Sequence, residues 1–148
     1  MATKRNTADI DTIVMHCTAT KEGKDFTAKD VDAWHRQRGF DGIGYHILVR
    51  LDGTYERGRA DNEVGAHCPQ EGMNRRAIAI CYVGGLDANG NPKDTRTAAQ
   101  VRTMITLIRT YKARYPRIKA VVGHRDVKGV NKACPCFNAR AEYAQLIK

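Results

Sequence analysis

The sequence predicts an α/β fold, with a central mixed β-sheet flanked by helices. Short apolar patterns typical of strands alternate with helical patterns along the 148 residues, as in α/β proteins. One pair of strand patterns is joined by an Asp-Gly turn, which signals an antiparallel hairpin within the sheet. A chain of this length can bury one continuous core, so we expect a single domain over residues 1–148.

The first half of the chain predicts a strand, a helix and a hairpin. The apolar run IVMHC at residues 13–17 predicts a buried strand that ends in polar residues. The capping pattern TAKD begins a helix that we place at residues 27–38, before a glycine typical of helix ends. The run YHILVR at residues 45–50 predicts a strand, which the Asp-Gly turn connects to a second strand at residues 54–57.

The second half predicts two more strands and two helices. The run AIAICYV at residues 77–83 is continuously apolar and has the length of a central strand, and a turn-rich loop follows it. A second capping pattern at Thr97 begins a long amphipathic helix that ends before Pro116. The last strand is expected at residues 120–123 and a terminal helix at residues 139–147.

The composition is that of a globular protein without an export signal. Hydrophobic residues make up 42% of the chain and charged residues 28%, which argues against a long disordered segment. No apolar run has the length of a membrane span, and the N-terminal residues lack the apolar segment of a secretory signal. We therefore expect a protein that is made in the cytoplasm and does not insert stably into a membrane. We also expect it to be a monomer.

The chain is strongly basic. Its formal net charge of +9 would attract nucleic acid, an anionic membrane or an acidic cell-wall polymer. The basic residues are scattered along the chain, and only 7% of residues are aromatic, which leaves few platforms for stacking bases. We therefore expect no nucleic-acid partner.

The five cysteines favour metal binding or free thiols over a disulfide framework, because their number is odd and no export signal precedes them. Cys17, Cys68 and Cys81 are expected to be small buried hydrophobic residues. Cys134 and Cys136 lie in a polar loop after the last predicted strand, so they are the candidates for chemistry.

Two histidines end two of the predicted strands. His16 ends the first strand and His124 follows the last, so the two imidazoles would meet at one edge if these strands are neighbours. Cys134 can complete the set from the loop. Two histidines and one thiolate give a zinc site with a fourth position open to water, which is the pattern of a catalytic zinc.

Other interpretations of this loop remain open. Cys136 could act as a fourth ligand and close a structural zinc site, although Pro135 stiffens the turn and would oppose this. A cysteine-nucleophile hydrolase would instead use Cys134 or Cys136 with His124. In the simplest case, the polar residues of the loop are incidental.

Seven motifs follow one another along the chain: IVMHCTAT (13–20), WHRQRGF (34–40), GIGYHILV (42–49), VGAHCP (64–69), IAICYVGGLD (78–87), GHRD (123–126) and KACPCF (132–137). Together they resemble the zinc-dependent N-acetylmuramoyl-L-alanine amidases of the type 2 class, which includes phage lysozyme-like amidases and peptidoglycan recognition proteins. The resemblance implies the fold of that class. It also implies hydrolysis of the amide between the lactyl group of N-acetylmuramic acid and the L-alanine of the stem peptide.

The resemblance also implies roles for particular residues. His16, His124 and Cys134 would be the ligands of a Zn²⁺ cofactor, with Tyr45 and Lys132 beside it as catalytic groups. Members of the class that lack the ligand cysteine bind peptidoglycan without cutting it. Such a non-catalytic binding module is the alternative function, and the presence of Cys134 argues against it.

Tyr45 and His46 point to opposite faces of their strand, so only one of them can face the metal. Intrinsic pKa favours His46 as a general base, but the resemblance selects Tyr45, so we expect His46 to be structural. His35 is expected to be a packing or surface residue of the first helix.

The loop between the hairpin and the central strand supplies two candidate substrate-binding residues. The resemblance implies that His67 lines the substrate groove, and an exposed loop histidine without a role is the alternative. Asn74 could contact sugar or peptide, and its alternative is a turn residue. Asp126 is expected either to orient His124 or to brace its loop.

The expected partner is peptidoglycan. Because an export signal is missing, the sequence favours a phage or prophage endolysin that accumulates in the cytoplasm and reaches the wall through a partner such as a holin. The positive charge would help to hold the protein on an anionic wall.

Overall fold

The computed structural model describes residues 2–148. Its strands are β1 (Thr12–Cys17), β2 (Thr20–Lys21), β3 (Ile47–Val49), β4 (Tyr55–Arg57), β5 (Ala77–Tyr82), β6 (Gly85–Leu86) and β7 (Ala120–Gly123). Its α-helices are α1 (Ala28–Gln37), α2 (Met73–Arg76), α3 (Ala98–Arg114) and α4 (Ala139–Tyr143). Short 3₁₀ turns are η1 (Thr7–Asp9), η2 (Gln70–Gly72), η3 (His124–Asp126) and η4 (Ala144–Ile147).

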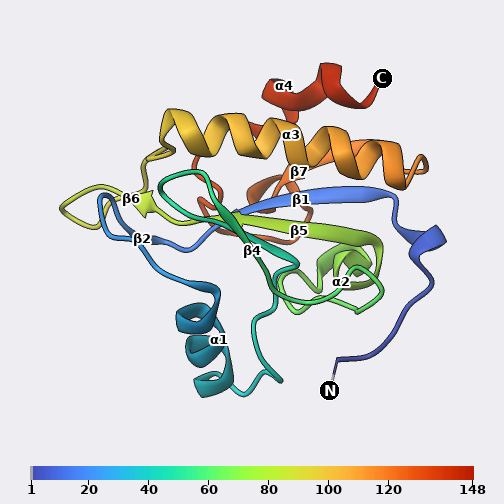
Figure 1. The fold of residues 1–148 in the computed structure, drawn as a ribbon, viewed down its shortest axis with the longest axis horizontal. Coiled ribbons are helices and arrows are strands. Elements are labelled where there is room, and N and C mark those ends of the chain that lie inside the picture. Colours follow the sequence, from blue (N-terminus) through green and yellow to red (C-terminus); the bar gives the residue numbers. More distant parts are fainter. Residues whose placement is uncertain (1) are drawn as a thin grey trace.

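Five of the strands form a mixed sheet in the order β4-β3-β5-β1-β7. The strands β3, β5, β1 and β7 are parallel, and β4 is antiparallel to β3 as the predicted hairpin requires. The helix α3 crosses one face of the sheet and α1 lies on the other side (Figure 1). The predicted fold class, a mixed sheet flanked by helices, is confirmed.

The alternation of side chains along β1 assigns its residues to two cores. Ile13 and Met15 point toward α3 and share a cluster with Met104 and Ile108 of that helix. Val14 belongs to a separate cluster on the opposite face. His16 is two residues beyond Val14, so alternation places its side chain on that opposite face of the sheet, away from α3.

The starts of both long helices were predicted correctly. Thr27 and Asp30 form a reciprocal capping box at the start of α1, with the Thr27 hydroxyl accepting from the Asp30 N–H. Thr97 and Gln100 do the same at the start of α3. The Gln100 side-chain amide also donates to the Val83 carbonyl at 3.0 Å, so the same residue ties the helix to the chain after β5.

Several details differ from the sequence expectation. The strand expected at residues 45–50 covers only Ile47–Val49, so Tyr45 and His46 precede it, and the short helix α2 was not predicted. The second hairpin strand is shorter than residues 54–57, and the terminal helix gives way to the 3₁₀ turn η4 after Tyr143. A small parallel sheet of β2 and β6 was not predicted. A strand of two residues is too short to show a periodic pattern. In addition, the Gly84-Gly85 pair reads as a turn in the sequence, and both glycines adopt positive φ angles.

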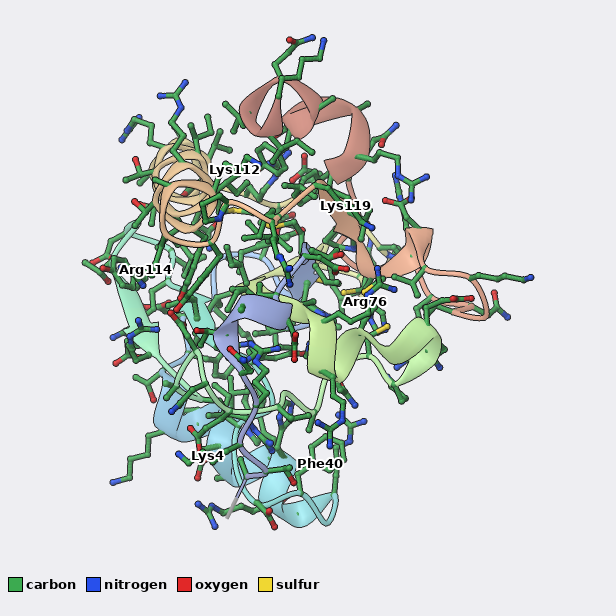
Figure 2. The ribbon with its side chains drawn as sticks, turned by 90° about the vertical axis from the view of Figure 1, so that its right-hand side faces the viewer. Lys4, Phe40, Arg76, Lys112, Arg114 and Lys119 are labelled. Carbon is green, nitrogen blue, oxygen red and sulfur yellow. The ribbon has the colours of Figure 1, made fainter. Side chains whose placement is uncertain are left out.

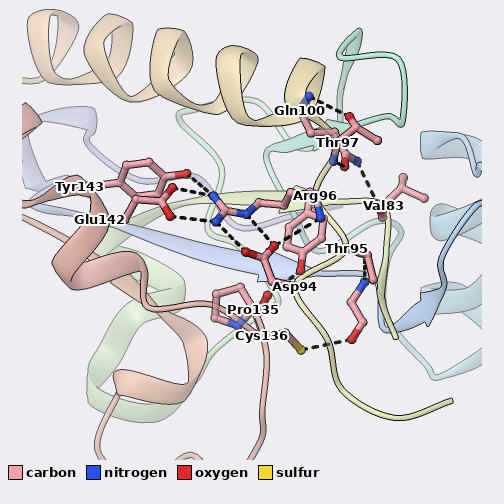
Figure 3. Close-up of polar contacts among 12 residues, drawn as sticks. Val83, Asp94, Thr95, Arg96, Thr97, Gln100, Pro135, Cys136, Glu142 and Tyr143 are labelled. Atoms are coloured by element: carbon pink, nitrogen blue, oxygen red, sulfur yellow. Dashed lines mark hydrogen bonds and ion pairs between the residues drawn. The ribbon is translucent and has the colours of Figure 1, made fainter. Parts of the chain in front are cut away.

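An arginine connects the segment before α3 to the C-terminal helix α4. The Arg96 guanidinium donates to Asp94, to Glu142 and to the Tyr143 hydroxyl (Figure 3). Its carbon Cζ also lies 3.4 Å from the centre of the Phe137 ring. Because Phe137 and α4 follow directly on the candidate metal-binding loop, this contact set anchors the far end of that loop.

Candidate active site

Strand pairing brings His16 and His124 together. The strands β1 and β7 are parallel neighbours in which Met15 pairs with Gly123. The next residues, His16 and His124, therefore lie at the same edge of the sheet. The two imidazole rings are 4.5 Å apart between centroids, and both residues are buried. The condition under which the sequence placed the two imidazoles together, that these strands are neighbours, is met.

The thiol of Cys134 completes the cluster. The ligand atoms of His16, His124 and Cys134 all lie within 4.8 Å of one another, and the Cys134 sulfur is 3.8 Å from Nδ1 of His16. The backbone N–H of Cys17 donates to the same sulfur at 3.2 Å. Two imidazole nitrogens and one thiolate are a donor set that suits zinc.

The second cysteine of the loop does not join the cluster. The Cys136 thiol donates to the Gly85 carbonyl at 3.3 Å, and within residues 2–148 the cluster comprises His16, His124 and Cys134 alone. The structure therefore gives no support to a closed site with Cys136 as the fourth ligand. Cys17, Cys68 and Cys81 are buried, as the sequence suggested.

A pocket of about 540 Å³ opens over this cluster. Its wall contains all of the site residues that the sequence singled out: His16, Tyr45, His67, Asn74, His124, Lys132 and Cys134. These residues come from strands, loops and turns far apart in the chain. The fold therefore brings the candidate metal ligands and the candidate catalytic groups into one concave site, as an active site requires.

Tyr45 and His46 lie just before β3 and not within a strand, yet their side chains point in different directions, as expected. The Tyr45 ring lies in the pocket wall, 5.0 Å from the His16 ring between centroids. His46 points away into the protein, where Nδ1 accepts from the Ala79 N–H at 3.0 Å and Nε2 lies 2.9 Å from the Glu63 carbonyl. His46 is therefore structural. Burial raises the pKa of Tyr45 well above its ordinary value, so its hydroxyl keeps its proton at neutral pH.

His16 is held as a neutral imidazole. Burial lowers its pKa well below the ordinary histidine value, and the nearby His67, His124 and Lys132 lower it further. A neutral ring is the form that binds metal ions. Lys132 itself is exposed at the pocket wall, so its ammonium is free to approach a bound substrate.

His67 contacts His16 directly, with Nδ1 of His67 at 2.9 Å from Nε2 of His16. The loop that carries His67 is fixed by Asn74, whose side-chain oxygen accepts from the N–H groups of His67 and Cys68, both at 2.8 Å. Asn74 thus braces the loop as well as lining the pocket. His67 is not an exposed loop residue, and substrate contacts of His67 and Asn74 stay predictions.

Other pocket residues received a smaller role from the sequence or were not singled out. His35 is buried and accepts from the Gly44 N–H at 2.8 Å, which supports the expected packing role, but it also lines the pocket. Arg38 and Phe40, after α1, line the same pocket. Both belong to the motif WHRQRGF, but no role was predicted for either residue. Asp126 accepts from the Gly123 N–H at 2.8 Å, so it braces the turn that carries His124.

Known structures share this arrangement of sheet and helices. The structure of bumblebee PGRP-SA matches 97% of the chain and 85% of its own length with a TM-score of 0.77, at 21% identity, which shows the fold alone. The N-acetylmuramoyl-L-alanine amidase LysC from Clostridium intestinale URNW matches 98% of the chain and 91% of its own length with a TM-score of 0.77, at 34% identity. The fold is therefore that of the peptidoglycan recognition protein and phage amidase class.

The sequence comparisons agree with the structural ones. The N-acetylmuramoyl-L-alanine amidase family matches residues 6–137. The endolysin of Klebsiella phage KP32 is 38% identical over 128 residues, which cover 86% of this chain and 82% of that protein. The chain belongs to the N-acetylmuramoyl-L-alanine amidase family, and the resemblance and amidase activity inferred from its motifs are confirmed.

Proposed function

We propose that the chain is a zinc-dependent endolysin that hydrolyses the amide bond between N-acetylmuramic acid and L-alanine in peptidoglycan. The observation that carries the proposal is the cluster of His16, His124 and Cys134, with ligand atoms within 4.8 Å of one another in the pocket wall. Tyr45 and Lys132 line the same pocket. The endolysin and amidase relatives support the substrate and the bond.

Zinc is the metal that this donor set fits best. Imidazole nitrogens and a thiolate suit zinc, whereas magnesium and calcium prefer oxygen ligands. When bound, zinc would polarise the substrate carbonyl and lower the pKa of a water molecule to about 7. His16, His124 and Cys134 would hold the zinc, and three protein ligands suit a catalytic site better than a closed structural one.

The remaining chemistry belongs to Tyr45 and Lys132. The protonated phenol of Tyr45 can hydrogen-bond the attacking water and help to deliver a proton to the leaving amine of L-alanine. The ammonium of Lys132 can stabilise the negative charge that develops on the carbonyl oxygen in the transition state. His67 and Asn74 form another part of the wall, where we propose that they contact the sugar or the stem peptide.

We further propose that the chain acts as a monomeric single domain with no nucleic-acid partner. An endolysin made in the cytoplasm would reach the wall with the help of a holin. The alternative, a module that binds peptidoglycan without cutting it, would keep the pocket but would not need the complete cluster. The presence of Cys134 beside both histidines favours the enzyme.

Mass spectrometry of digested peptidoglycan tests this function. Purified peptidoglycan is incubated with zinc-loaded protein, with chelator-treated protein, with Cys134→Ser and with Cys136→Ser as the matched control. We expect free stem peptides with a new L-alanine N-terminus from the zinc-loaded protein and from the control. The chelator-treated protein and Cys134→Ser should release none.

Two outcomes would overturn the proposal. Intact peptidoglycan in every sample, despite bound zinc, would favour a binding module or a structural zinc site. Cleavage that persists in chelator would instead indicate a thiol nucleophile.

A further inference from the structure

The two ring nitrogens of His16 have different neighbours. Nδ1 faces the candidate metal cluster, 3.8 Å from the Cys134 sulfur. Nε2 lies on the other side of the ring, 2.9 Å from Nδ1 of His67. The distance between these nitrogens is that of a hydrogen bond, so one of the two atoms must carry the proton.

The chemistry of a metal ligand decides which atom donates. A ring nitrogen that binds a metal ion carries no proton, so in a neutral His16 that ligates through Nδ1 the proton is on Nε2. Nε2 therefore donates, and Nδ1 of His67 accepts. We infer that His67 is a positioning residue, whose Nδ1 accepts the His16 Nε2 proton and thereby fixes His16 in the tautomer and orientation that bind zinc. This inference rests on the proposed zinc function.

The surroundings of His67 hold its ring in one place. The His16 and His67 rings meet edge to face, with centroids 4.9 Å apart and planes at 89°. On the other side the His67 ring packs over Gly65, where an added Cβ would lie 2.5 Å from its Cδ2 atom. Asn74 anchors the backbone of the same loop through the His67 N–H. A small residue at position 65 and a fixed loop therefore aim His67 at His16.

The second nitrogen of His67 has no contact that would place the ring. Its Nε2 atom is shielded from solvent and has no hydrogen-bond partner within residues 2–148. Leaving a buried polar atom unpaired is unfavourable, so the ring is not placed to satisfy its own hydrogen bonds. Within the same described residues, the contact with His16 is the one hydrogen bond of the ring, and it explains the placement.

Zinc affinity, measured without substrate, tests the inference. Metal-free protein is titrated with zinc against a chromophoric chelator for wild type, His67→Ala and His67→Asn. Loss of an oriented partner of a ligand histidine typically weakens metal binding about 10- to 100-fold, and we expect this of His67→Ala. The asparagine introduced by His67→Asn would carry an acceptor oxygen near the place of Nδ1, so this variant should recover most of the affinity.

Two further variants separate positioning from packing. Tyr111→Phe removes the hydroxyl of another buried ring, outside the pocket, and should leave zinc affinity unchanged even where it lowers stability. Gly65→Ala removes no histidine, but its added methyl group crowds the His67 ring and should displace it, so this variant should weaken zinc binding. Circular dichroism of each protein confirms that it is folded before its zinc affinity is compared.

Nuclear magnetic resonance of the ring nitrogens gives a readout independent of activity. In zinc-loaded wild type we expect His67 protonated at Nε2 and unprotonated at Nδ1. The inference is wrong if His67 has the opposite tautomer, if folded His67→Ala binds zinc as tightly as wild type, or if His67→Asn is as weak as His67→Ala. A wild type that binds no zinc overturns the proposed function, and this inference with it. A wild type that binds zinc without cutting peptidoglycan overturns the proposed function alone.

Discussion

At the scale of single residues, the Tyr45 hydroxyl can be tested without disturbing the pocket. Tyr45→Phe keeps the ring that packs 5.0 Å from His16 and removes only the proton donor. We expect kcat to fall about 100-fold, the usual contribution of a positioned acid or base. Zinc affinity should not change, because the hydroxyl is not a predicted ligand. A steady-state assay on a soluble muropeptide measures kcat, and an unchanged kcat would remove Tyr45 from the mechanism.

The role of Lys132 can be tested against Lys128, a second lysine in the same loop. Lys132 lines the pocket, whereas Lys128 is exposed in the same loop and does not line it. Lys132→Ala should lower kcat about 10²- to 10³-fold, because one donor to the developing oxyanion is lost. Lys128→Ala should leave kcat within about twofold of wild type, since a surface substitution away from the pocket changes little. Equal effects of the two substitutions would indicate a general charge effect instead.

The sequence predicted the site residues better than it predicted their contacts. His16 and His124 could be proposed as a pair because each lies at the end of a predicted strand, and the structure supplies the strand order that brings them together. The contact between His16 and His67 spans 51 positions, and it depends on the loop geometry that Gly65 and Asn74 impose. No local pattern encodes such a contact, so it is seen only in the folded structure.

At the scale of secondary-structure elements, Arg96 is the residue whose loss should most weaken the attachment of α4. Its side chain is 5% exposed and pairs with Asp94 and Glu142. These partners are themselves partly exposed, so solvent screens each ion pair. Arg96→Leu would remove both ion pairs and the contact of the guanidinium with the Phe137 ring. We expect the free energy of unfolding to fall by about 2 kcal/mol as a result.

Urea unfolding measures this loss. Arg102→Leu on the exposed face of α3 is the control, and it should change the free energy of unfolding by less than about 0.5 kcal/mol. If Arg96→Leu were as stable as the control, the network in Figure 3 would contribute nothing measurable to stability.

The same network predicts a pH dependence. Hydrogen bonds from Arg96 lower the pKa of Glu142, and for Asp94 they outweigh partial burial, which by itself raises the pKa. Both carboxyl groups thus bind protons more weakly in the folded state than in the unfolded state. Their contribution to the free energy of unfolding is therefore fully present above the unfolded pKa values of about 4, and it is lost as the pH falls through the folded pKa values. Unfolding midpoints should therefore decline below about pH 4.5, and less steeply in Arg96→Leu. Parallel curves would contradict this.

Element boundaries followed from the sequence where capping and periodicity coincide. Capping boxes at Thr27 and Thr97 identified the starts of α1 and α3, and continuous apolar runs identified β1 and β5. The sheet of β2 and β6 could not be predicted, because it forms only when the segments that follow Thr18 and Gly84 meet in the folded chain. Tertiary contacts, not local propensity, create these short strands.

At the scale of the whole molecule, the basic residues cover the surface instead of lining one groove. Figure 2 shows Lys4, Arg76, Lys112, Arg114 and Lys119 spread over one view of the protein. Carboxylates partly neutralise some of them, but the formal net charge is still +9. Within residues 2–148, no helix combines the length and the apolar character that a membrane span needs. A diffuse positive surface suits weak, non-specific attraction to a large polyanion.

This distribution predicts that salt will affect wall binding more than catalysis. Raising the salt concentration from about 0.1 M to about 1 M shortens the screening length from about 10 Å to about 3 Å, so the net charge of +9 loses most of its reach. Binding of a Cys134→Ser variant to intact wall fragments, measured by sedimentation, should weaken at least severalfold over this range.

Cleavage of a small, soluble muropeptide by the active protein is the control for that measurement. Its rate should change much less with salt, because the pocket contacts act at short range, where ions screen them little. If salt lowered wall binding and soluble cleavage equally, charge would act within the pocket and Lys132 would be the first residue to examine. If neither changed, the positive surface would have no part in holding the enzyme on the wall, and recognition would rest on the pocket alone.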